Sequence, residues 1–402
     1  MKKNLHLKIS KQVVKKNKQH IYGGLRWFGK KDPLSLLHLK QAGAEMIISA
    51  LHDVPLGEVW EASSIKTYQK EIAKSGLEWK VVESLPVHET IKYQGLGFEV
   101  FIEKYKKSIE NLSSCGINTI TYNFMPVLDW VRTDHHFINQ DKTTTLRFDP
   151  VAMAYFDCFI LNRSMAQKEY DSQLMDEVKK FAQTISEKEK EQLKKNVLLG
   201  LPGNQHRFTI EELKEKIIPY QSINASQLRE NLIYFLREII PVAKACGVNL
   251  AIHPDDPPFS ILGLPRIVST SADLDFLFTT LPEIENGLCF CSGSLGATVN
   301  NDLNYIFNSH QSRIHFLHFR NVDCFPDGSF NESAHLSGDH NMRNLVQLAV
   351  DSAKQRKVVL PFRPDHGFLQ AFEKQHRFYP GYSLLGRMQG LASLKGLVLG
   401  LS

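Results

Sequence analysis

Four residues of metal-binding type stand at the ends of four short apolar runs in the second half of the chain. His253 follows the run at residues 248–252, and three similar runs further along end in or near Cys291, His318 and Asp365. A short apolar run that ends in one polar residue before a loop is typical of a buried parallel strand. Two imidazoles, a thiolate and a carboxylate suit Mn, Fe(II), Co or Zn rather than Mg. The pattern therefore predicts a metal site at the carboxyl ends of four strands.

A lone histidine at a strand end is more often a structural residue than a ligand. Four ligand-type residues at the ends of four successive strands favour the metal site, because a closed barrel brings all of its strand ends to one axis. Cys289 lies in the same predicted strand as Cys291. We expect these two side chains to project from opposite faces of the strand, so that Cys291 alone is a ligand.

Strand and helix signals alternate along the chain, which is typical of an α/β protein. We expect strands at residues 21–28, 45–51, 77–82, 117–122, 248–252, 287–291, 313–318 and 358–365. We expect helices at residues 34–42, 63–75, 98–114, 227–245, 272–280, 301–308, 342–355 and 383–396, the first capped by Asp32 and the second by Ser63 or Ser64. Eight strands, each followed by a helical segment, predict a (β/α)8 TIM barrel.

Two stretches fall outside this alternation. Residues 1–20 hold seven lysines and no acidic residue, and we expect them to form a basic, solvated N-terminal extension. Residues 126–225 are far more than one barrel helix needs, and helices are expected there at 151–161 and 176–195. Insertions at the carboxyl face of a barrel usually shape or cover the site. We therefore expect one barrel domain over residues 21–402, with residues 126–225 as a large helical insertion after strand 4 at that face.

Charge and cysteine usage exclude several classes of protein. The net charge is +5, and removing the seven lysines of the extension leaves −2, so we expect no nucleic-acid partner. No run approaches ~18 apolar residues and the lysine-rich start lacks the apolar core of a signal peptide, so we expect no membrane partner. Six cysteines without paired spacing favour reduced thiols in a soluble, cytoplasmic protein.

A series of longer motifs runs from about residue 22 to residue 396. They are Arg26-Trp-Phe-Gly29, Ala50-Leu-His52, Val81-Val-Glu-Ser84, Tyr122-Asn-Phe-Met-Pro-Val-Leu-Asp-Trp130, His253-Pro-Asp-Asp-Pro-Pro258 with Leu262-Gly-Leu-Pro-Arg-Ile-Val268, Arg363-Pro-Asp-His-Gly367 and Pro380-Gly-Tyr-Ser383. Together these motifs resemble the D-mannonate dehydratase family. The resemblance implies a barrel of the xylose isomerase-like group that uses Mn2+ or Fe2+. It also implies loss of water from D-mannonate to give 2-keto-3-deoxy-D-gluconate in hexuronate breakdown.

The resemblance also assigns roles to individual residues. Its metal ligands fall on His253, Cys291, His318 and Asp365, and its acid–base pair falls on His366 and Tyr382. Histidine, with a reference pKa near ~6.5, can serve as acid or base, whereas tyrosine at ~10 needs a nearby cation to act as a base. Which of the two is the acid stays open. Asp365 and His366 are consecutive and must point in different directions, and we expect Gly367 to provide the sharp turn.

Further polar residues near strand ends are predicted to contact a substrate. Arg320 and Arg363 flank metal ligands and could form forked hydrogen bonds to a carboxylate. His52, Glu83 and Asn123 end the second, third and fourth strands, so they should face the same cavity, although a structural role is equally compatible with the sequence.

The sequence favours a metal-dependent dehydratase over two alternatives. One is a sugar isomerase or epimerase on the same barrel, although those enzymes often use carboxylate-rich sites whereas this set contains a thiolate. The other is a non-catalytic sugar-acid-binding barrel, which the intact ligand set and the pair Asp365–His366 disfavour. We expect D-mannonate as the small-molecule partner and a homodimer as the candidate assembly.

Overall fold

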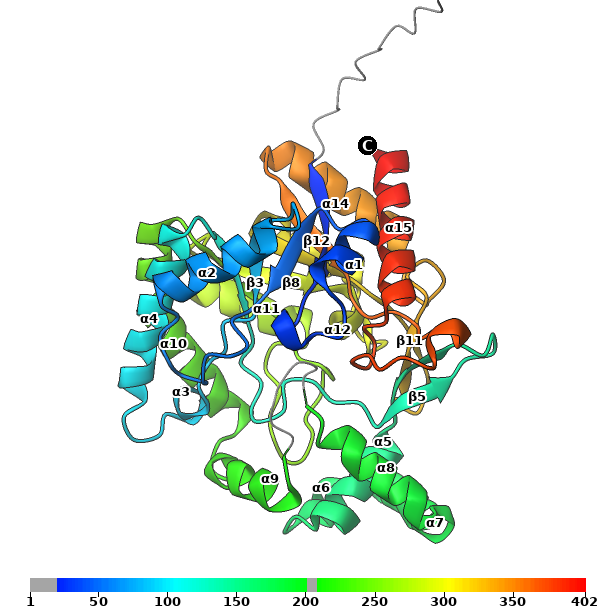
Figure 1. Cartoon of the computed structure of the whole chain (residues 1–402). Coiled ribbons are helices and arrows are strands. Elements are labelled where there is room, and N and C mark those ends of the chain that lie inside the picture. Colours follow the sequence, from blue (N-terminus) through cyan, green and yellow to red (C-terminus); the bar gives the residue numbers. More distant parts are fainter. Residues whose placement is uncertain (1–19, 201–207) are drawn as a thin grey trace, which may run out of the picture.

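Eight parallel strands form a closed barrel in the computed structural model, which describes residues 20–200 and 208–402 (Figure 1). The strands follow the order β1-β12-β9-β8-β7-β4-β3-β2 around the barrel. Their bounds are β1 (Ile21–Arg26), β2 (Met46–Ser49), β3 (Trp79–Glu83), β4 (Thr119–Tyr122), β7 (Asn249–Ile252), β8 (Asn286–Cys291), β9 (Ile314–Phe319) and β12 (Leu360–Pro364). The predicted TIM barrel is confirmed. The predicted basic extension lies, but for His20, outside the described residues.

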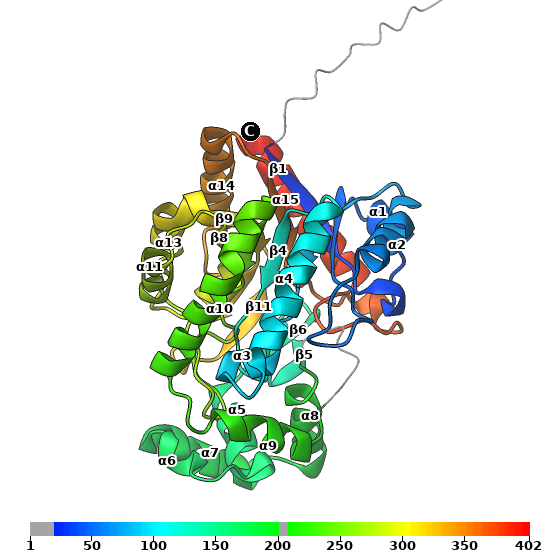
Figure 2. The ribbon, with the colours of Figure 1, turned by 90° about the vertical axis from the view of Figure 1, so that its left-hand side faces the viewer.

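Helices cover the outside of the barrel, and each one except the C-terminal α15 precedes the next barrel strand. They are α1 (Leu36–Gln41), α2 (Ala62–Ala73), α4 (Phe98–Ser114), α10 (Ala225–Cys246), α11 (Ser271–Thr280), α13 (Leu303–His310), α14 (Met342–Arg356) and α15 (Leu384–Leu401). Figure 2 shows α4 and α10 side by side, where the rings of Tyr105 and Phe235 meet edge to face with centroids 5.1 Å apart. Helix α10 ends where Gly247 takes a left-handed φ of 63°, a conformation that glycine adopts without steric cost.

The first two helices begin differently from the sequence prediction. Ser35, not Asp32, caps α1, because the Ser35 hydroxyl accepts the His38 N–H. Asp32 instead accepts the N–H groups of Phe28 and Leu34, both at 2.9 Å, and so closes the turn before the helix. Helix α2 starts at Ala62, so the predicted caps Ser63 and Ser64 lie inside it.

The large insertion between β4 and β7 is confirmed, but it contains strands as well as helices. The strands β5 (Asp134–Ile138) and β6 (Thr144–Phe148) join β10 (Asn321–Cys324) and β11 (Phe330–Ser333) in an antiparallel sheet of order β10-β11-β6-β5. The second hairpin comes from the segment after β9, so two distant parts of the chain share one sheet beyond the barrel mouth. Sequence alternation did not predict this sheet.

The helical part of the insertion packs beyond the carboxyl ends of the barrel strands (Figures 1 and 2). Its helices are α5 (Pro150–Tyr155), α6 (Ala166–Glu169), α7 (Ser172–Thr184), α8 (Glu187–Val197) and α9 (Ile210–Ile217). The single helix predicted over 176–195 is wrong: Ile185 leaves the helical conformation and Ser186 caps α8 in a capping box with Glu189. Among the described residues, every helix is too short or too polar to cross a lipid bilayer.

A buried ion pair holds the insertion together, and its removal should destabilise this region. Asp157 is fully buried and binds Arg163 through two hydrogen bonds of 2.9 and 2.8 Å, and Tyr170 Oη donates to the same carboxylate at 2.9 Å. Asp157→Asn removes the buried one of the two carboxylates that compensate Arg163, the other being the more exposed Glu169, so the variant should be less stable. The loss should appear as a lower unfolding midpoint and faster proteolysis within the insertion.

Asp176→Asn is the matched control on the same insertion. Asp176 pairs with Lys179 at 2.9 Å, but both side chains are more than 60% exposed. Solvent screens such pairs, so this variant should unfold at the same midpoint as the unmodified protein. Equal stability of the two variants would contradict the structural role of Asp157.

Candidate functional site

The carboxyl ends of β7, β8, β9 and β12 bring the four predicted metal ligands together. His318 Nδ1 lies 3.2 Å from His253 Nε2 and 3.9 Å from Asp365 Oδ2. Cys291 Sγ lies 3.9 Å from Asp365 Oδ2, and the ligand atoms of Cys291, His318 and Asp365 all lie within 4.8 Å of one another. The barrel register pairs Cys291 with His318 on adjacent strands, which explains their closeness.

Hydrogen bonds orient both imidazoles so that one unprotonated nitrogen of each faces the centre. His253 Nδ1 lies 2.7 Å from the Pro254 carbonyl oxygen, and His318 Nε2 lies 3.2 Å from Glu83 Oε2. Since a carbonyl and a carboxylate only accept, these nitrogens carry the protons and leave His253 Nε2 and His318 Nδ1 as donors of a lone pair. Burial lowers the pKa of His253, with Asp365 opposing this, which also favours a neutral ligand.

Glu83 ends β3 and lines the inner cavity, the position that the sequence predicted without assigning it a role. Its Oε1 accepts from Arg26 Nη1 at 2.5 Å and from Arg363 Nη2 at 2.7 Å, and its Oε2 accepts from Arg363 Nε at 2.8 Å. Burial opposes ionisation, but Arg363 and Arg26 hold the pKa of Glu83 well below its usual range. Glu83 is therefore a carboxylate that fixes the tautomer of His318.

Asp365 and Cys291 are surrounded by groups that suit negatively charged ligands. Burial opposes ionisation of Asp365, but Arg363, whose Nη1 donates to Oδ1 at 2.5 Å, holds its pKa well below the usual range. The N–H and hydroxyl of Ser294 lie 3.4 and 3.2 Å from Cys291 Sγ. Two neutral imidazoles, a carboxylate and a thiol with donors aimed at its sulfur fit a divalent transition metal.

Cys289 also faces the inside of the barrel, so the expectation that it points away from Cys291 is wrong. Residues two apart on a strand project from the same face. Cys289 packs in the interior cluster with Ile48, Val81, Ala251 and Phe316. Its Sγ lies within 4.8 Å of the ligand nitrogens of His253 and His318.

His366 and Tyr382, the predicted acid–base pair, stand beside this centre. Their ring centroids lie 5.4 Å apart, and Tyr382 Oη donates to Asp365 Oδ1 at 3.3 Å. Burial, and then Asp365, raise the pKa of Tyr382 above its usual value, so this phenol keeps its proton. His366 Nδ1 lies 3.0 Å from Glu332 Oε1, and its Nε2 lies 3.7 Å from Asp365 Oδ1.

The turn after Asp365 is made by His366 itself, which takes a φ of 56°. The expectation that Gly367 provides this turn is wrong, because Gly367 does not have a positive φ. Gly367 is needed for another reason: a Cβ there would lie 2.5 Å from the backbone carbon of Gly386. The loop therefore passes close to the start of α15 at Gly367.

A ring of buried charges beside His366 joins the predicted substrate contact Arg320 to Arg132, Asp256 and Glu332, which were not among the predicted site residues. Arg132 binds Asp256 at 2.7 Å and Glu332 at 2.8 Å, and Arg320 binds Asp256 at 2.6 Å and Glu332 at 2.9 Å. Burial opposes ionisation of Glu332, but Arg320 and its neighbours lower the pKa to about 2. Glu332 therefore offers a charged oxygen to His366. It lies on β11, and no strand-end signal marks it in the sequence.

The site opens into a cavity of about 40 Å³ that joins a larger hollow of about 560 Å³. Arg363 lines the inner cavity, and Asn123, whose Nδ2 donates to Asp129 at 3.3 Å, lines both spaces. His52 lines the outer hollow, where burial and then Arg26 lower its pKa to about 4. The described residues that line these two spaces do not include Arg320, whose guanidinium lies in the ring of buried charges.

A second hollow of about 760 Å³ lies behind the loops that carry His366 and Tyr382. Lys195, Lys374 and Arg377 line it with several histidines, and the described lining residues include no acidic side chain. This region has a positive potential, which raises the local concentration of anions near the site.

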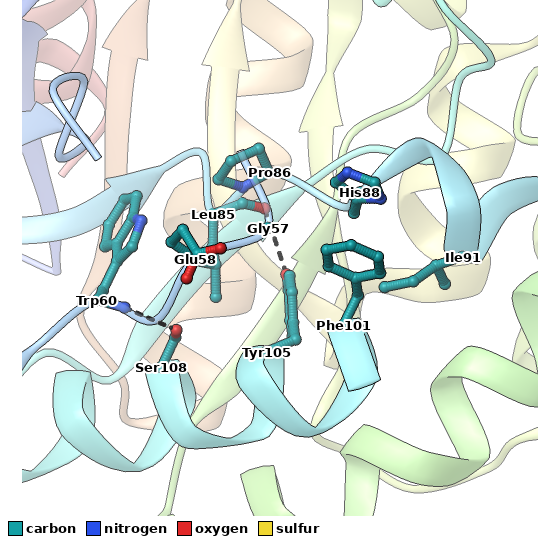
Figure 3. Close-up of a pocket in the computed structure, with 10 residues that line it drawn as sticks. All are labelled: Gly57, Glu58, Trp60, Leu85, Pro86, His88, Ile91, Phe101, Tyr105 and Ser108. Carbon is teal, nitrogen blue, oxygen red and sulfur yellow. Dashed lines mark hydrogen bonds between the residues drawn. The ribbon is translucent and has the colours of Figure 1, made fainter. Parts of the chain in front are cut away.

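A much smaller void of about 10 Å³ lies between the loop after β2 and helix α4 (Figure 3). Tyr105 Oη donates to the Leu85 carbonyl at 3.3 Å, and the Trp60 N–H donates to Ser108 Oγ at 3.0 Å, so the polar groups around it are paired (Figure 3). This space holds at most one water molecule and is a gap in the packing.

Loss of the Glu83 carboxylate should weaken metal binding without removing a ligand. In Glu83→Gln the hydrogen bond to His318 becomes weaker, and such a change beside a ligand typically costs about 10–100-fold in metal affinity. Equilibrium dialysis with elemental analysis measures this. Glu58→Gln, at an exposed pair with Lys104, is the control and should bind as the unmodified protein does. Unchanged affinity in Glu83→Gln would remove Glu83 from the centre.

Comparisons with known proteins identify relatives over nearly the whole chain. The family model described as D-mannonate dehydratase (UxuA) matches residues 21–402. The mannonate dehydratase of Marinomonas sp. (strain MWYL1) is 43% identical over 384 residues, which cover 94% of this chain and 98% of that protein. The mannonate dehydratase of Saccharophagus degradans is 42% identical over 380 residues, covering 93% and 96%.

Two solved structures also resemble this chain. The mannonate dehydratase of Streptococcus suis serotype 2 superposes with a TM-score of 0.76 at 33% identity, with 95% of both chains covered. A xylose isomerase-like TIM barrel protein of Mycobacterium smegmatis, solved in complex with magnesium, superposes with a TM-score of 0.50 at 14% identity, covering 91% of this chain and 88% of that one. The second likeness is one of fold alone.

Proposed function

The chain belongs to the D-mannonate dehydratase (UxuA) family, and on that premise we propose which of its residues remove water from D-mannonate. It is a mannonate dehydratase, a hydro-lyase. The reaction removes the proton from C2 and the hydroxyl group from C3. The C2–H electron pair forms the C2=C3 bond as the C3–O bond breaks, and the resulting enol becomes 2-keto-3-deoxy-D-gluconate. The chemistry therefore needs a base at C2 and an acid at the C3 oxygen.

We propose that His253, Cys291, His318 and Asp365 hold Mn2+ or Fe2+. This is supported by the convergence of the ligand atoms of Cys291, His318 and Asp365, with His253 Nε2 lying 3.2 Å from His318 Nδ1. Both imidazoles are oriented and Asp365 is ionised. The bound cation supplies positive charge that offsets the negative charge built up beside the substrate carboxylate when the C2 proton is lost. Without that charge, a side-chain base could not remove a proton so weakly acidic.

His366 is the base in this proposal. Its Nδ1 lies 3.0 Å from Glu332 Oε1, which leaves Nε2 as the nitrogen that would take the proton. The Glu332 carboxylate is then well placed to stabilise the imidazolium formed when Nε2 accepts the C2 proton. This is the observation that carries the assignment of His366.

Tyr382 is the acid. Its raised pKa keeps the phenol protonated, and its Oη lines the same cavity as His366. The phenol donates its proton to the departing C3 hydroxyl, which leaves as water, and Arg363 and Arg26 lie close enough to lower the cost of the phenolate. The pair can then exchange protons with solvent before the next turnover.

Arg363 and Asn123 are the proposed substrate contacts in the inner cavity, and His52 is the proposed contact in the outer hollow. The predicted contact of Arg320 with substrate has less support, since its guanidinium binds Asp256 and Glu332. Arg320 acts on the reaction through Glu332, as a positioning residue for His366. A homodimer stays a prediction, which light scattering after gel filtration would test.

Incubation of the metal-loaded protein with D-mannonate, followed by assay for 2-keto-3-deoxy-D-gluconate, tests the proposed function. Product should form from D-mannonate and not from D-gluconate, because the base reaches only one face of C2. An isomerase or epimerase would instead rearrange the substrate without loss of water. A non-catalytic barrel would bind the sugar acid and return it unchanged.

His366→Asn should leave metal content and sugar-acid binding largely intact while turnover falls by roughly 10²–10⁴-fold, the usual range for a general base. Metal stoichiometry and turnover are measured on the same preparation. If His366 only orients Asp365, the variant should lose metal together with activity. Near-normal turnover would remove His366 from the mechanism.

Tyr382→Phe should lower turnover over a similar range of roughly 10²–10⁴-fold, because the ring packing is kept and only the acidic proton is lost. Tyr379→Phe is the matched control, since Tyr379 is half-buried on the same loop and contacts Phe28 as Tyr382 does. The control should keep normal turnover. Equal rates for the two variants would exclude Tyr382 as the acid.

A further inference from the structure

The segment after β4 carries a carboxylate to the passage between the two spaces of the site. Asp129 lines both the inner cavity and the outer hollow. Among the described residues, only Asn123 donates a hydrogen bond to the Asp129 carboxylate, through Nδ2 at 3.3 Å. A carboxylate has two oxygens with several lone pairs, so Asp129 can accept further hydrogen bonds from a ligand that extends from one space into the other.

The inner cavity is too small for a whole six-carbon sugar acid. Its volume of about 40 Å³ is room for roughly three water molecules, far fewer atoms than such an acid contains. Under the proposed function the reacting carbons C1 to C3 lie in this cavity, which His366 and Tyr382 line. The rest of the sugar chain then extends past Asp129 into the outer hollow, and its hydroxyl groups need hydrogen-bond acceptors there.

A turn with an unfavourable backbone conformation places Asp129 at this passage. Val127 takes a φ of 59°, in the left-handed region that β-branched residues rarely adopt. Across the turn, the Leu128 N–H donates to the Pro126 carbonyl at 2.6 Å. Such a conformation persists only where the surrounding structure imposes it, and it is often found at ligand sites.

Two groups of opposite charge hold the turn from different sides. Glu89, which follows β3, accepts the Val127 N–H at 3.0 Å, and Arg266, which follows β7, donates to the Leu128 carbonyl at 2.6 Å. Burial opposes ionisation of Glu89, but Lys92, which binds its Oε1 at 2.6 Å, lowers the pKa of this carboxyl. A charged acceptor and a charged donor therefore fix one N–H and one carbonyl of the turn.

We propose that Asp129 is a specificity-determining residue, whose carboxylate accepts hydrogen bonds from the C5 and C6 hydroxyl groups of the sugar acid, and that Glu89 and Arg266 are positioning residues for its turn. The proposal rests on the proposed function, which puts the reacting carbons in the inner cavity. In the alternative role, Asp129 only offsets the buried charge of Arg266, whose Nε and Nη1 have no hydrogen-bond partner among the described residues.

The four-carbon acid with the C2 and C3 configurations of D-mannonate separates these two roles, because it keeps the reacting end and lacks C5 and C6. In Asp129→Ala, kcat/KM for D-mannonate should fall about 10–100-fold, the loss expected for hydrogen bonds to a charged group, while the inhibition constant of the four-carbon acid should stay the same. Asp129→Asn keeps the shape of the side chain and should lower kcat/KM about tenfold, because charge-assisted hydrogen bonds are roughly twice as strong as neutral ones.

The asparagine variant decides the question if the alanine variant fails to fold. A normal kcat/KM, or equal losses for the two acids, would overturn the role of Asp129. Turnover of D-mannonate by the unmodified protein tests the proposed function separately, so failure of one is distinguishable from failure of the other.

Glu89→Gln tests the support of the turn. It should lower kcat/KM for D-mannonate and leave the inhibition constant of the four-carbon acid unchanged, because only the placement of Asp129 is disturbed. Asp157→Asn, which weakens a buried ion pair elsewhere in the insertion, is the control and should leave both constants unchanged. An unchanged kcat/KM in Glu89→Gln, or an equal loss in the control, would overturn the positioning role of Glu89.

Discussion

The carboxylate of Glu83, held between two guanidinium groups, is the constraint on which the site depends. Arg26 on β1 and Arg363 on β12 both bind it, and Glu83 in turn orients His318 on β9. The strands β1, β12 and β9 are neighbours in the closed barrel. Glu83 lies on β3 and contacts their residues across the barrel mouth. A carboxylate buried in this way is stable only because both arginines compensate its charge. The barrel therefore closes around a fixed array of charges, and the metal ligands take their orientation from it.

The ring of Arg132, Asp256, Arg320 and Glu332 repeats this principle on the other side of His366. Burying two cations and two anions contributes little to net stability, since desolvation offsets most of their attraction. The ring instead positions Glu332, which lies on a strand outside the barrel, 3.0 Å from His366 Nδ1. The two ion-pair systems meet at Asp365, which contacts both Arg363 and Arg320. Ligand and base thus share one electrostatic environment.

The barrel and the metal ligands could be predicted from sequence because both follow from local patterns. His253 and Cys291 stand where an apolar run meets a loop, and a parallel barrel brings such positions together. Glu332 and Arg132 could not be found in this way, because they meet only when hairpins from two distant segments form one sheet. The expectation that Cys289 points away from Cys291 misapplied strand periodicity, which places residues two apart on the same face. The expectation that Gly367 makes the turn followed from glycine being the residue type that turns most easily. His366 takes the left-handed conformation, whereas Gly367 packs against Gly386 where a side chain has no room.

The shared antiparallel sheet makes the order of assembly matter. Its pairing of Phe330 with Phe148 joins residues far apart in the chain, and contacts of such long sequence separation form late because a large loop must close first. The metal centre depends on closure of the same kind, because Glu83 orients His318 from 235 residues away in the chain. The oriented ligands and the positioned base are therefore both late products of folding, and a chain whose two halves have not yet met holds neither.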